Sequence, residues 1–378
     1  MKIKNYTKIL EMVMASPGIN RKKVSTLTKL SNQTLSNLVK DLSDFGYILE
    51  FPLDGPTGYG RKPIGLKLNY KAFLIVSLEF TYNSFGVYLN TGDGEVLLYE
   101  KYALHKSQDV VSLIKRGVEK ALKHANSRVF ALVMSAEGII DEENRKLTHV
   151  KALSLKNLDL GKELAYLDLP LFLLNDTNLI SHYVNLTRVK PHNFMVVKLD
   201  TGIGCSIALD RHIQKTSANN MPGKLGHLKV ANTDEDVLCW CGGKNCLSAF
   251  ISRDYIESRF NRPYEEALML IRDGQEPAFR EKIIMYLSPI LANITTLLGI
   301  EKIYAIGKMV DVLGSNFIRT LDRSITPSIP SWINFLGVEE FPIPSIPVQC
   351  SAYFMDYFLN NILSYLEDVD ETPFKVEG

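Results

Sequence analysis

Three of the five cysteines in this chain lie within eight consecutive positions, at Cys239, Cys241 and Cys246. A histidine, His227, precedes the first of them by twelve residues. Three thiolates and one imidazole are ligands that can close a tetrahedral shell around Zn²⁺. The sequence therefore predicts a structural zinc site made of these four residues.

A glycine pair inside this stretch, Gly242-Gly243, supports the zinc prediction. A chain that returns a third thiolate to the same ion within a few residues must turn tightly, and glycine permits such turns. The alternative is that the cysteines are buried or paired in a disulfide. Their tight clustering, and the scarcity of disulfides inside cells, favour the metal site.

The length of 378 residues allows two or three domains, each with its own core. Hydrophobic residues make up 46% of the chain and charged residues 22%, as in ordinary soluble proteins. No apolar run approaches the roughly eighteen residues that a membrane helix needs. Glu11 and Pro17 interrupt any signal-like apolar segment after the basic start, so we expect a cytoplasmic protein that contacts no membrane.

The net charge of +1 conceals an asymmetry between the two ends of the chain. Residues 1–70 contain eleven lysines and arginines against five acids, a balance of +6, which leaves −5 for the remainder. A small basic segment attached to a mildly acidic body suits a head that contacts phosphates.

The head shows the periodicity of three short helices. The first is expected to end at Pro17-Gly18, and the second covers residues 21–30 with Val24 and Leu27 inward. Ser31-Asn32 caps a third helix, whose inward positions are Leu35, Leu38, Val39, Leu42 and Phe45. Its opposite face carries uncharged polar groups suited to reading base edges in double-stranded DNA, at Gln33, Thr34, Ser36 and Asn37.

Two strands, at residues 47–51 and 64–68, follow the third helix and predict a hairpin. The turn between them contains Arg61 and Lys62, which would hold the DNA backbone or minor groove as a wing does. An alternative is that this three-helix unit with a hairpin is a protein-interaction module. The recognition-helix pattern, the basic excess and the wing together favour DNA.

Gly223-Lys224-Leu225-Gly226-His227, followed by the Cys-x-Cys-Gly-x-x-x-Cys-Leu stretch, resembles the signature of the ROK family of repressors and sugar kinases. The turn at residues 58–63 likewise resembles the wing of the family's repressors. The resemblance implies an α/β fold: a winged helix-turn-helix at residues 1–70, then an actin-like, ribonuclease-H-like two-lobed ATPase-type body at residues 71–378, with a zinc loop at about 223–248.

Within the body, the hydrophobic pattern predicts further elements. We expect strands at residues 73–81, 85–89, 96–99, 129–134, 171–174 and 194–199. We expect helices at residues 110–126, 249–260, 264–273, 277–298 and 351–366, with an ordered proline-rich connection at 327–347. The sequence shows no internal repeat.

Three nucleotide-binding elements of the family's kinases are altered here. Ser77, Glu79 and Phe80 stand in the first phosphate loop, where Glu79 and Phe80 are expected to repel and fill the cradle. Asp200 opens the second loop, and Lys308 replaces a glycine of the adenosine loop. Phosphoryl transfer needs all of these parts, so we expect no enzyme. The chain is instead expected to be a repressor of sugar-related genes, binding its operator as a homodimer or a dimer of dimers. The alternative is a sugar kinase with an added DNA-binding head.

Effector binding is expected at Asn175, Asp176, Lys224 and His227. Asn175-Asp176 follows an apolar strand and matches the family's sugar-contacting and general-base pair, although such a pair also serves as a helix cap. Lys224 and Ser248 stand where the resemblance implies two sugar-binding glutamates. We therefore expect a sugar phosphate or sugar acid as effector, with Lys224 as its counter-ion. The alternative is a pocket that no longer binds a small ligand.

Overall fold

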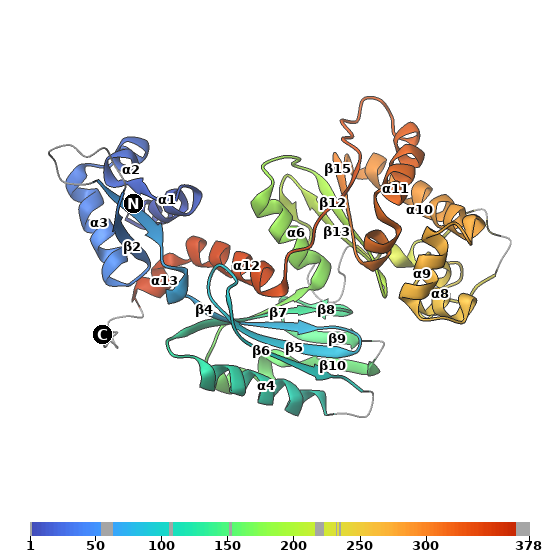
Figure 1. Ribbon diagram of the computed structural model, residues 1–378, viewed down its shortest axis with the longest axis horizontal. Coiled ribbons are helices and arrows are strands. Elements are labelled where there is room, and N and C mark those ends of the chain that lie inside the picture. Colours follow the sequence, from blue (N-terminus) through green and yellow to red (C-terminus); the bar gives the residue numbers. More distant parts are fainter. Residues whose placement is uncertain are drawn as a thin grey trace.

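The computed structural model describes residues 2–53, 63–105, 109–150, 153–215, 223–231, 233 and 236–367. They form a small N-terminal head and a body of two lobes, each built on a five-stranded sheet (Figure 1). The body is an α/β structure, which confirms the expected class.

The head contains three helices and a three-stranded sheet of order β1-β3-β2. Its elements are α1 (Lys2–Ala15), β1 (Ile19–Asn20), α2 (Arg21–Thr28), α3 (Asn32–Asp44), β2 (Ile48–Pro52) and β3 (Ile64–Leu68). Side-chain caps begin two of the helices, since Asn20 accepts the Lys23 N–H at 2.9 Å and Ser31 accepts the Thr34 N–H at 3.1 Å. The expected hairpin is confirmed by the antiparallel pairing of β2 with β3.

One prediction of an inward side chain in the head was wrong. Leu27 is 55% exposed, whereas Val24 is buried as expected. α2 has only eight residues and buries a single side chain, so its second apolar residue remains at the surface. Arg61 and Lys62 lie outside the described residues.

The first lobe contains the sheet β11-β7-β4-β5-β6. Its strands are β4 (Leu74–Phe80), β5 (Ser84–Asn90), β6 (Val96–Ala103), β7 (Val129–Ala136) and β11 (Leu171–Asn175). Helix α4 (Val110–His124) covers one face, and the C-terminal helix α12 (Ile346–Asn360) covers the other (Figure 1). A small antiparallel sheet joins β8 (Ile139–Asp141), β9 (Lys146–Val150) and β10 (Leu155–Asp159), and the short helix α5 (Leu160–Glu163) follows.

The second lobe contains the sheet β14-β13-β12-β15-β16. Its strands are β12 (Phe194–Leu199), β13 (Ile203–Leu209), β14 (His212–Ile213), β15 (Lys302–Ile306) and β16 (Val338–Glu340). Helix α6 (Asp176–Thr187) packs against this sheet and against α12. The remaining helices are α7 (Ser248–Ile251), α8 (Arg253–Phe260), α9 (Tyr264–Arg272), α10 (Pro277–Leu298), α11 (Lys308–Ile325) and, at the C-terminal end, α13 (Ile362–Glu367).

The two large sheets share one strand plan. In each, an antiparallel meander of three strands is extended by two parallel strands beside its first strand, in the order β6-β5-β4-β7-β11 and β14-β13-β12-β15-β16. The sequence showed no internal repeat, because strands need only a similar hydrophobic pattern to adopt the same topology.

Two helix predictions differ from the structure, and one long helix was not predicted. The helix expected at 249–260 is broken at Ser252, whose backbone is extended, so α7 ends there and α8 begins. Helix α11 was not expected; Gly314 interrupts its regular backbone with a φ of 69°. The closing helix begins earlier, at Ile346, and a break at Asn361 separates α12 from α13.

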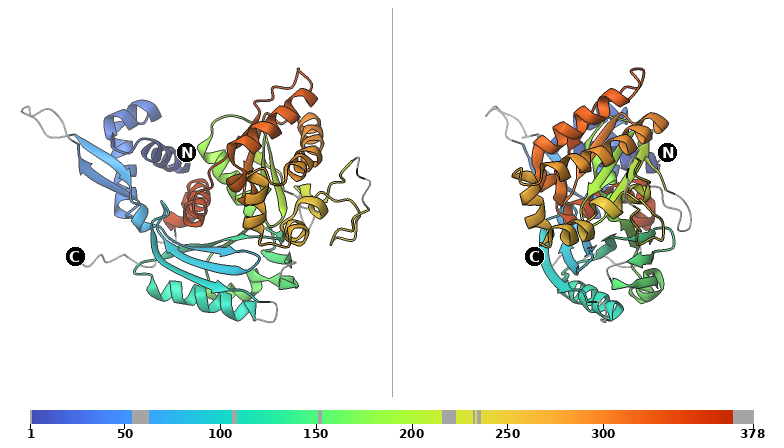
Figure 2. Two further views of the ribbon diagram at one scale, coloured as in Figure 1. Left: turned by 45° about the vertical axis from the view of Figure 1, so that its right-hand side comes forward. Right: turned by 90° about the vertical axis from the view of Figure 1, so that its right-hand side faces the viewer.

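The head and the body share one hydrophobic core. Tyr47 of the head stacks on Phe73 at 5.1 Å, and both rings contact Phe358 of α12, at 5.2 Å and 4.9 Å. All three side chains are buried. Helix α12 therefore lies between the head and the two lobes (Figures 1 and 2).

Candidate functional site

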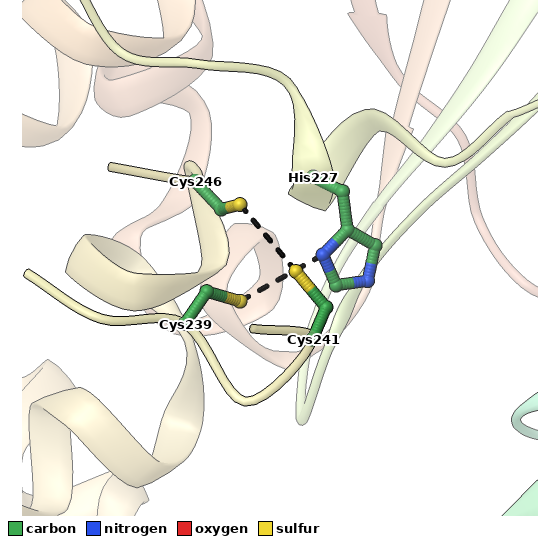
Figure 3. A group of neighbouring side chains, drawn as sticks. All are labelled: His227, Cys239, Cys241 and Cys246. Atoms are coloured by element: carbon green, nitrogen blue, oxygen red, sulfur yellow. Dashed lines mark hydrogen bonds between the residues drawn. The ribbon is translucent and has the colours of Figure 1, made fainter. Parts of the chain in front are cut away.

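The predicted metal ligands come together in the structure. Their donor atoms, from His227, Cys239, Cys241 and Cys246, all lie within 4.8 Å of one another (Figure 3). The Cys241 and Cys246 sulfurs are 3.7 Å apart, and the Cys239 sulfur is 3.7 Å from Nδ1 of His227. Thiolates about 2.3 Å from one zinc ion stand about 3.8 Å apart at tetrahedral angles. The cluster therefore has the donor types and spacing to hold a metal ion.

The backbone around the cluster explains why the sequence has two glycines there. Gly242 has a φ of 87°, and a Cβ on Gly243 would lie 2.7 Å from Nζ of Lys229 and 3.5 Å from two cluster sulfurs. The alternative of a disulfide is wrong, because all five cysteines are free.

Local electrostatics favour the metal-binding forms of His227 and Cys241 and disfavour the thiolate of Cys239. Burial, together with nearby Lys224 and Lys229, lowers the pKa of His227, which favours the neutral imidazole that binds metals. A backbone hydrogen bond from Gly243 lowers the pKa of Cys241, whereas burial raises that of Cys239 to about 11. Nζ of Lys229 lies 3.3 Å from the Cys246 sulfur, where a cation offsets thiolate charge.

A pocket of about 510 Å³ lies between the two lobes, beside this cluster. It is in the usual size range of small-molecule sites, roughly 300–1,000 Å³. All four residues expected to bind an effector line it, namely Asn175, Asp176, Lys224 and His227. Ser248 lines it as well.

Asn175 and Asp176 are brought to the pocket by the junction of β11 and α6. Both side chains accept the Thr177 N–H, at 3.2 Å and 2.8 Å, so the helix-cap interpretation of this pair is confirmed. Capping uses one oxygen of Asp176, and the other faces Lys198 at 2.6 Å. The pair therefore caps a helix and lines the pocket.

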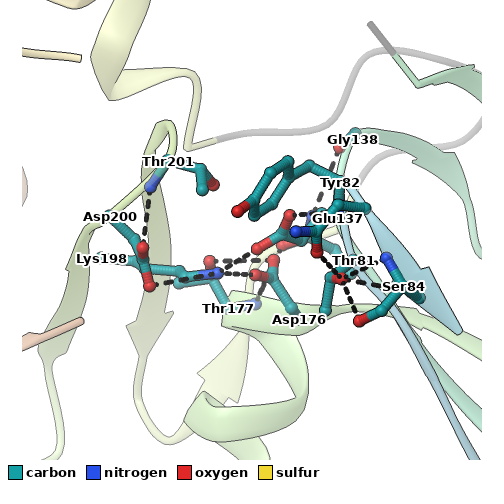
Figure 4. A network of polar contacts seen from close by, with 12 residues as sticks. Thr81, Tyr82, Ser84, Glu137, Gly138, Asp176, Thr177, Lys198, Asp200 and Thr201 are labelled. Carbon is teal, nitrogen blue, oxygen red and sulfur yellow. Dashed lines mark hydrogen bonds and ion pairs between the residues drawn. The ribbon is translucent and has the colours of Figure 1, made fainter. Parts of the chain in front are cut away.

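Lys198 is a pocket residue that the sequence analysis missed. Its ammonium lies 2.6 Å from Asp176, 2.7 Å from Glu137 and 4.0 Å from Asp200 (Figure 4). Burial favours the neutral amine, but the attraction of Asp176 and the other carboxylates outweighs it and holds the pKa of Lys198 well above its ordinary value. The signal in the sequence was one lysine in the otherwise apolar strand β12.

Lys198 also joins the lobes, since Glu137 directly follows β7 of the first lobe and Lys198 lies on β12 of the second. Two further contacts cross the same gap. The Trp240 ring stacks on His149 at 5.7 Å, and the Arg253 guanidinium lies 4.5 Å from the Tyr82 ring centroid. The pocket is thus bordered by cross-lobe contacts at several points.

The prediction that Glu79 and Phe80 occupy the phosphate-binding loop was wrong. Phe80 is only 1% exposed and packs in the core, and the Glu79 carboxylate accepts a hydrogen bond from Tyr88 at 3.2 Å. Neither residue lines the pocket. Successive side chains of a strand point to opposite faces of the sheet. Phe80 points to the face that α4 covers and joins the core there.

In the head, the exposed face of α3 carries the residues expected to read DNA. Gln33, Thr34 and Asn37 are exposed, and Ser36 is half-buried. The Thr34 hydroxyl also bonds the capping Ser31 at 2.8 Å. Leu35, Leu38, Val39 and Leu42 are buried on the opposite face, as expected.

Two lobes with one strand plan, facing a shared pocket, define an actin-like, kinase-type α/β body. The chain belongs to the ROK family, whose model matches residues 76–329. It is 26% identical over 258 residues to the xylose repressor of Caldicellulosiruptor bescii, a match covering 66% of this chain and 63% of that repressor. The chain thus spans less than two thirds of that relative's length.

Solved structures share the fold. A ROK family transcriptional regulator, described as a homologue of the Escherichia coli Mlc protein, superposes with a TM-score of 0.80 at 19% identity, covering 97% of this chain and 98% of that one. The ROK hexokinase of Thermus thermophilus superposes with a TM-score of 0.60 at 16% identity, covering 75% of this chain and 99% of that one. None of the helices in the described part of this chain combines the length and hydropathy needed to cross a bilayer.

Proposed function

We propose that this chain is a transcriptional repressor of sugar-related genes that binds duplex DNA as a homodimer. The observation that carries the proposal is the exposed polar face of α3, presented by a basic head on a kinase-type body. The relatives of this chain include a xylose repressor, which supports the proposal.

The head at residues 1–70 acts as a winged helix-turn-helix, and the body at residues 71–378 carries the effector pocket. Helix α3 enters the major groove, where Gln33, Thr34, Ser36 and Asn37 reach base edges. Arg61 and Lys62, which lie between β2 and β3 in the sequence, contact the DNA backbone. The balance of +6 over residues 1–70 supports this assignment, because phosphate contacts supply much of the affinity for DNA.

The body acts as a binding module and not as a kinase. A general base must reach the hydroxyl whose proton it removes. The Asp176 carboxylate instead caps α6 through one oxygen and pairs with Lys198 through the other. That ion pair supports a regulator over the alternative of a sugar kinase.

Zn²⁺ bound by His227, Cys239, Cys241 and Cys246 has a structural role. Four protein ligands leave no open position for a substrate. The ion ties η4 (Leu225–His227), which lines the pocket, to the loop that precedes α7. The role that we assign to the metal is therefore to maintain the shape of the pocket.

An effector in the pocket acts on the head through α6 and α12. Asp176 lies at the pocket end of α6, and His182 of the same helix packs edge-on against Tyr353 of α12 at 5.0 Å. Phe358, further along α12, contacts Tyr47 of the head. A ligand that moves α6 would thus change the position of the head relative to the body.

Protection mapping of the full chain on its own upstream DNA tests the proposal. We expect a protected site with two-fold symmetry, bound at least about a thousandfold more tightly than random DNA. Equal affinity for random and upstream DNA would remove the regulatory function. Phosphorylation of a sugar by ATP would support the kinase instead.

A further inference from the structure

The charged residues that line the pocket are not equally available to a ligand. The three basic ones are Lys198, Lys224 and Arg253. Lys198 is held by three carboxylates, and Arg253 pairs with Glu257 at 2.9 Å. Within the described residues, the Lys224 side-chain ammonium has no hydrogen bond and no ion pair. Lys224 is therefore the cation that a ligand can approach.

Lys224 is held in place by the backbone on either side of it. A Cβ on Gly223 would lie 1.8 Å from the Cys205 carbonyl oxygen, and Gly223 has a φ of 89°. A Cβ on Gly226 would lie 2.1 Å from the Ser248 hydroxyl. The segment can approach β13 and α7 this closely only with glycine at both positions, so Lys224 projects from a fixed backbone.

Lys224 is half-buried, and an ammonium group that loses water without gaining a partner costs free energy. Burial lowers the pKa of Lys224, and the attraction of Asp176 opposes that shift without a direct contact. An anion from a ligand would replace the lost water and supply the missing partner.

Polar groups that suit hydroxyls surround the same space. Asn175 and Asp176 line it from the junction of β11 and α6, and Thr201 and Ser248 line it from the second lobe. Acids outnumber bases in the pocket lining, with Glu137, Asp176, Asp254 and Glu257 against three cations. The lining as a whole thus does not attract anions, and any preference must be local to Lys224.

We propose that the pocket binds a sugar-like polyol carrying one anionic group, with that group on Lys224 and the hydroxyls toward Asn175 and Ser248. The inference rests on the proposed effector pocket and adds the chemical class of its ligand. A phosphate and a carboxylate are both candidates, because either accepts hydrogen bonds from an ammonium group.

Matched ligands and matched variants test the charge. Glucose, galactose and mannose are each compared with their 6-phosphate and with the corresponding uronic acid, which change only the substituent at carbon 6. Inorganic phosphate is a further probe. The full chain and the variants Lys224→Glu and Lys123→Glu are titrated by calorimetry and thermal shift; Lys123 is exposed on α4, away from the pocket lining.

We expect at least one 6-phosphate or uronic acid to bind wild type and Lys123→Glu, and to lose on the order of tenfold or more in affinity with Lys224→Glu. The phosphate and uronate arms identify which anion is preferred. Neutral sugars binding as tightly as their anionic forms, equal affinity for Lys224→Glu, binding of inorganic phosphate alone, or no binding across the series would each overturn the inference. Protection of DNA is scored separately, so a protein that protects its operator but binds no anion fails only here.

Discussion

Lys198 of β12 and Asp176 at the start of α6 form an ion pair of 2.6 Å between their side chains. The Lys198 side chain is only 15% exposed, and Glu137 accepts a second contact at 2.7 Å. A cation shared by two carboxylates that are only 17% and 20% exposed is costly to remove, because each carboxylate then loses its partner and regains little water.

Replacing Lys198 with methionine should therefore lower the free energy of unfolding by about 3–5 kcal/mol. The matched control is Lys120→Met, which breaks a pair with Glu100 in which Lys120 is 55% exposed. Exposed pairs are worth under about 1 kcal/mol. Urea titrations of both variants measure the two losses, and equal losses would show that the Lys198 cluster has no special weight.

Purified without added metal, the protein should contain one zinc per chain, measured by elemental analysis. Cys246→Ser should lose the metal and lower Tm, whereas Cys350→Ser should retain the metal, because Cys350 lies in the core away from the cluster. Chelator should lower the Tm of wild type, since a metal bound only by the folded state stabilises it. Less than about half an equivalent, with Tm unchanged in chelator, would contradict the zinc assignment.

Asn37→Ala should weaken binding to the true DNA site by about 1–3 kcal/mol and change binding to random DNA little, because an amide that reads a base adds mainly specificity. Competition assays at a fixed salt concentration measure both affinities. Arg61→Ala should weaken both if Arg61 holds phosphates. A base-reading role for Asn37 would be refuted by equal losses on the two DNAs.

His182 should make the protein sensitive to acid. Burial, and to a lesser degree Lys215, lowers the pKa of His182 to about 3. Below the unfolded pKa of about 6.5, the unfolded chain binds a proton that the folded chain refuses, so stability falls by about 1.4 kcal/mol per pH unit. That loss begins near pH 6.5 and continues toward pH 3.

The variant His182→Asn should remove about 2 kcal/mol of the stability lost between pH 7 and pH 5. His124→Asn, at an exposed position of α4, is the control and should keep the wild-type slope. Denaturant midpoints across this range provide the comparison. Parallel slopes for wild type and His182→Asn would show that this residue does not titrate as expected.

Phe358→Ala should cost about 3–5 kcal/mol and should destabilise head and body together, because the Phe358 ring joins Tyr47 to Phe73 in the shared core. The control Trp332→Ala removes a ring that is 84% exposed and should cost under about 0.5 kcal/mol. Calorimetry should give one transition for both parts. A separate, earlier transition of the head would contradict a shared core.

Features that depend on short spacing could be predicted from the amino-acid sequence alone. The His/Cys cluster, the cap at Ser31, the pair Asn175-Asp176 and six strands (β4, β5, β6, β7, β11 and β12) follow from local patterns, where neighbouring residues decide the structure. The small sheet of β8, β9 and β10 was not predicted. The ROK family was recognised from the same local motifs, and its model matches residues 76–329.

Contacts between residues far apart in the sequence could not be predicted, because they form only in the folded chain. Lys198 meets Glu137 across sixty-one positions of sequence, and Tyr47 meets Phe358 across more than three hundred, so no window of the sequence contains either contact. Leu27 has the apolar character of a core residue, yet on the short α2 it is 55% exposed. Burial is a property of the assembled fold, and the charge that a pocket offers depends on which of its lysines that fold has already paired.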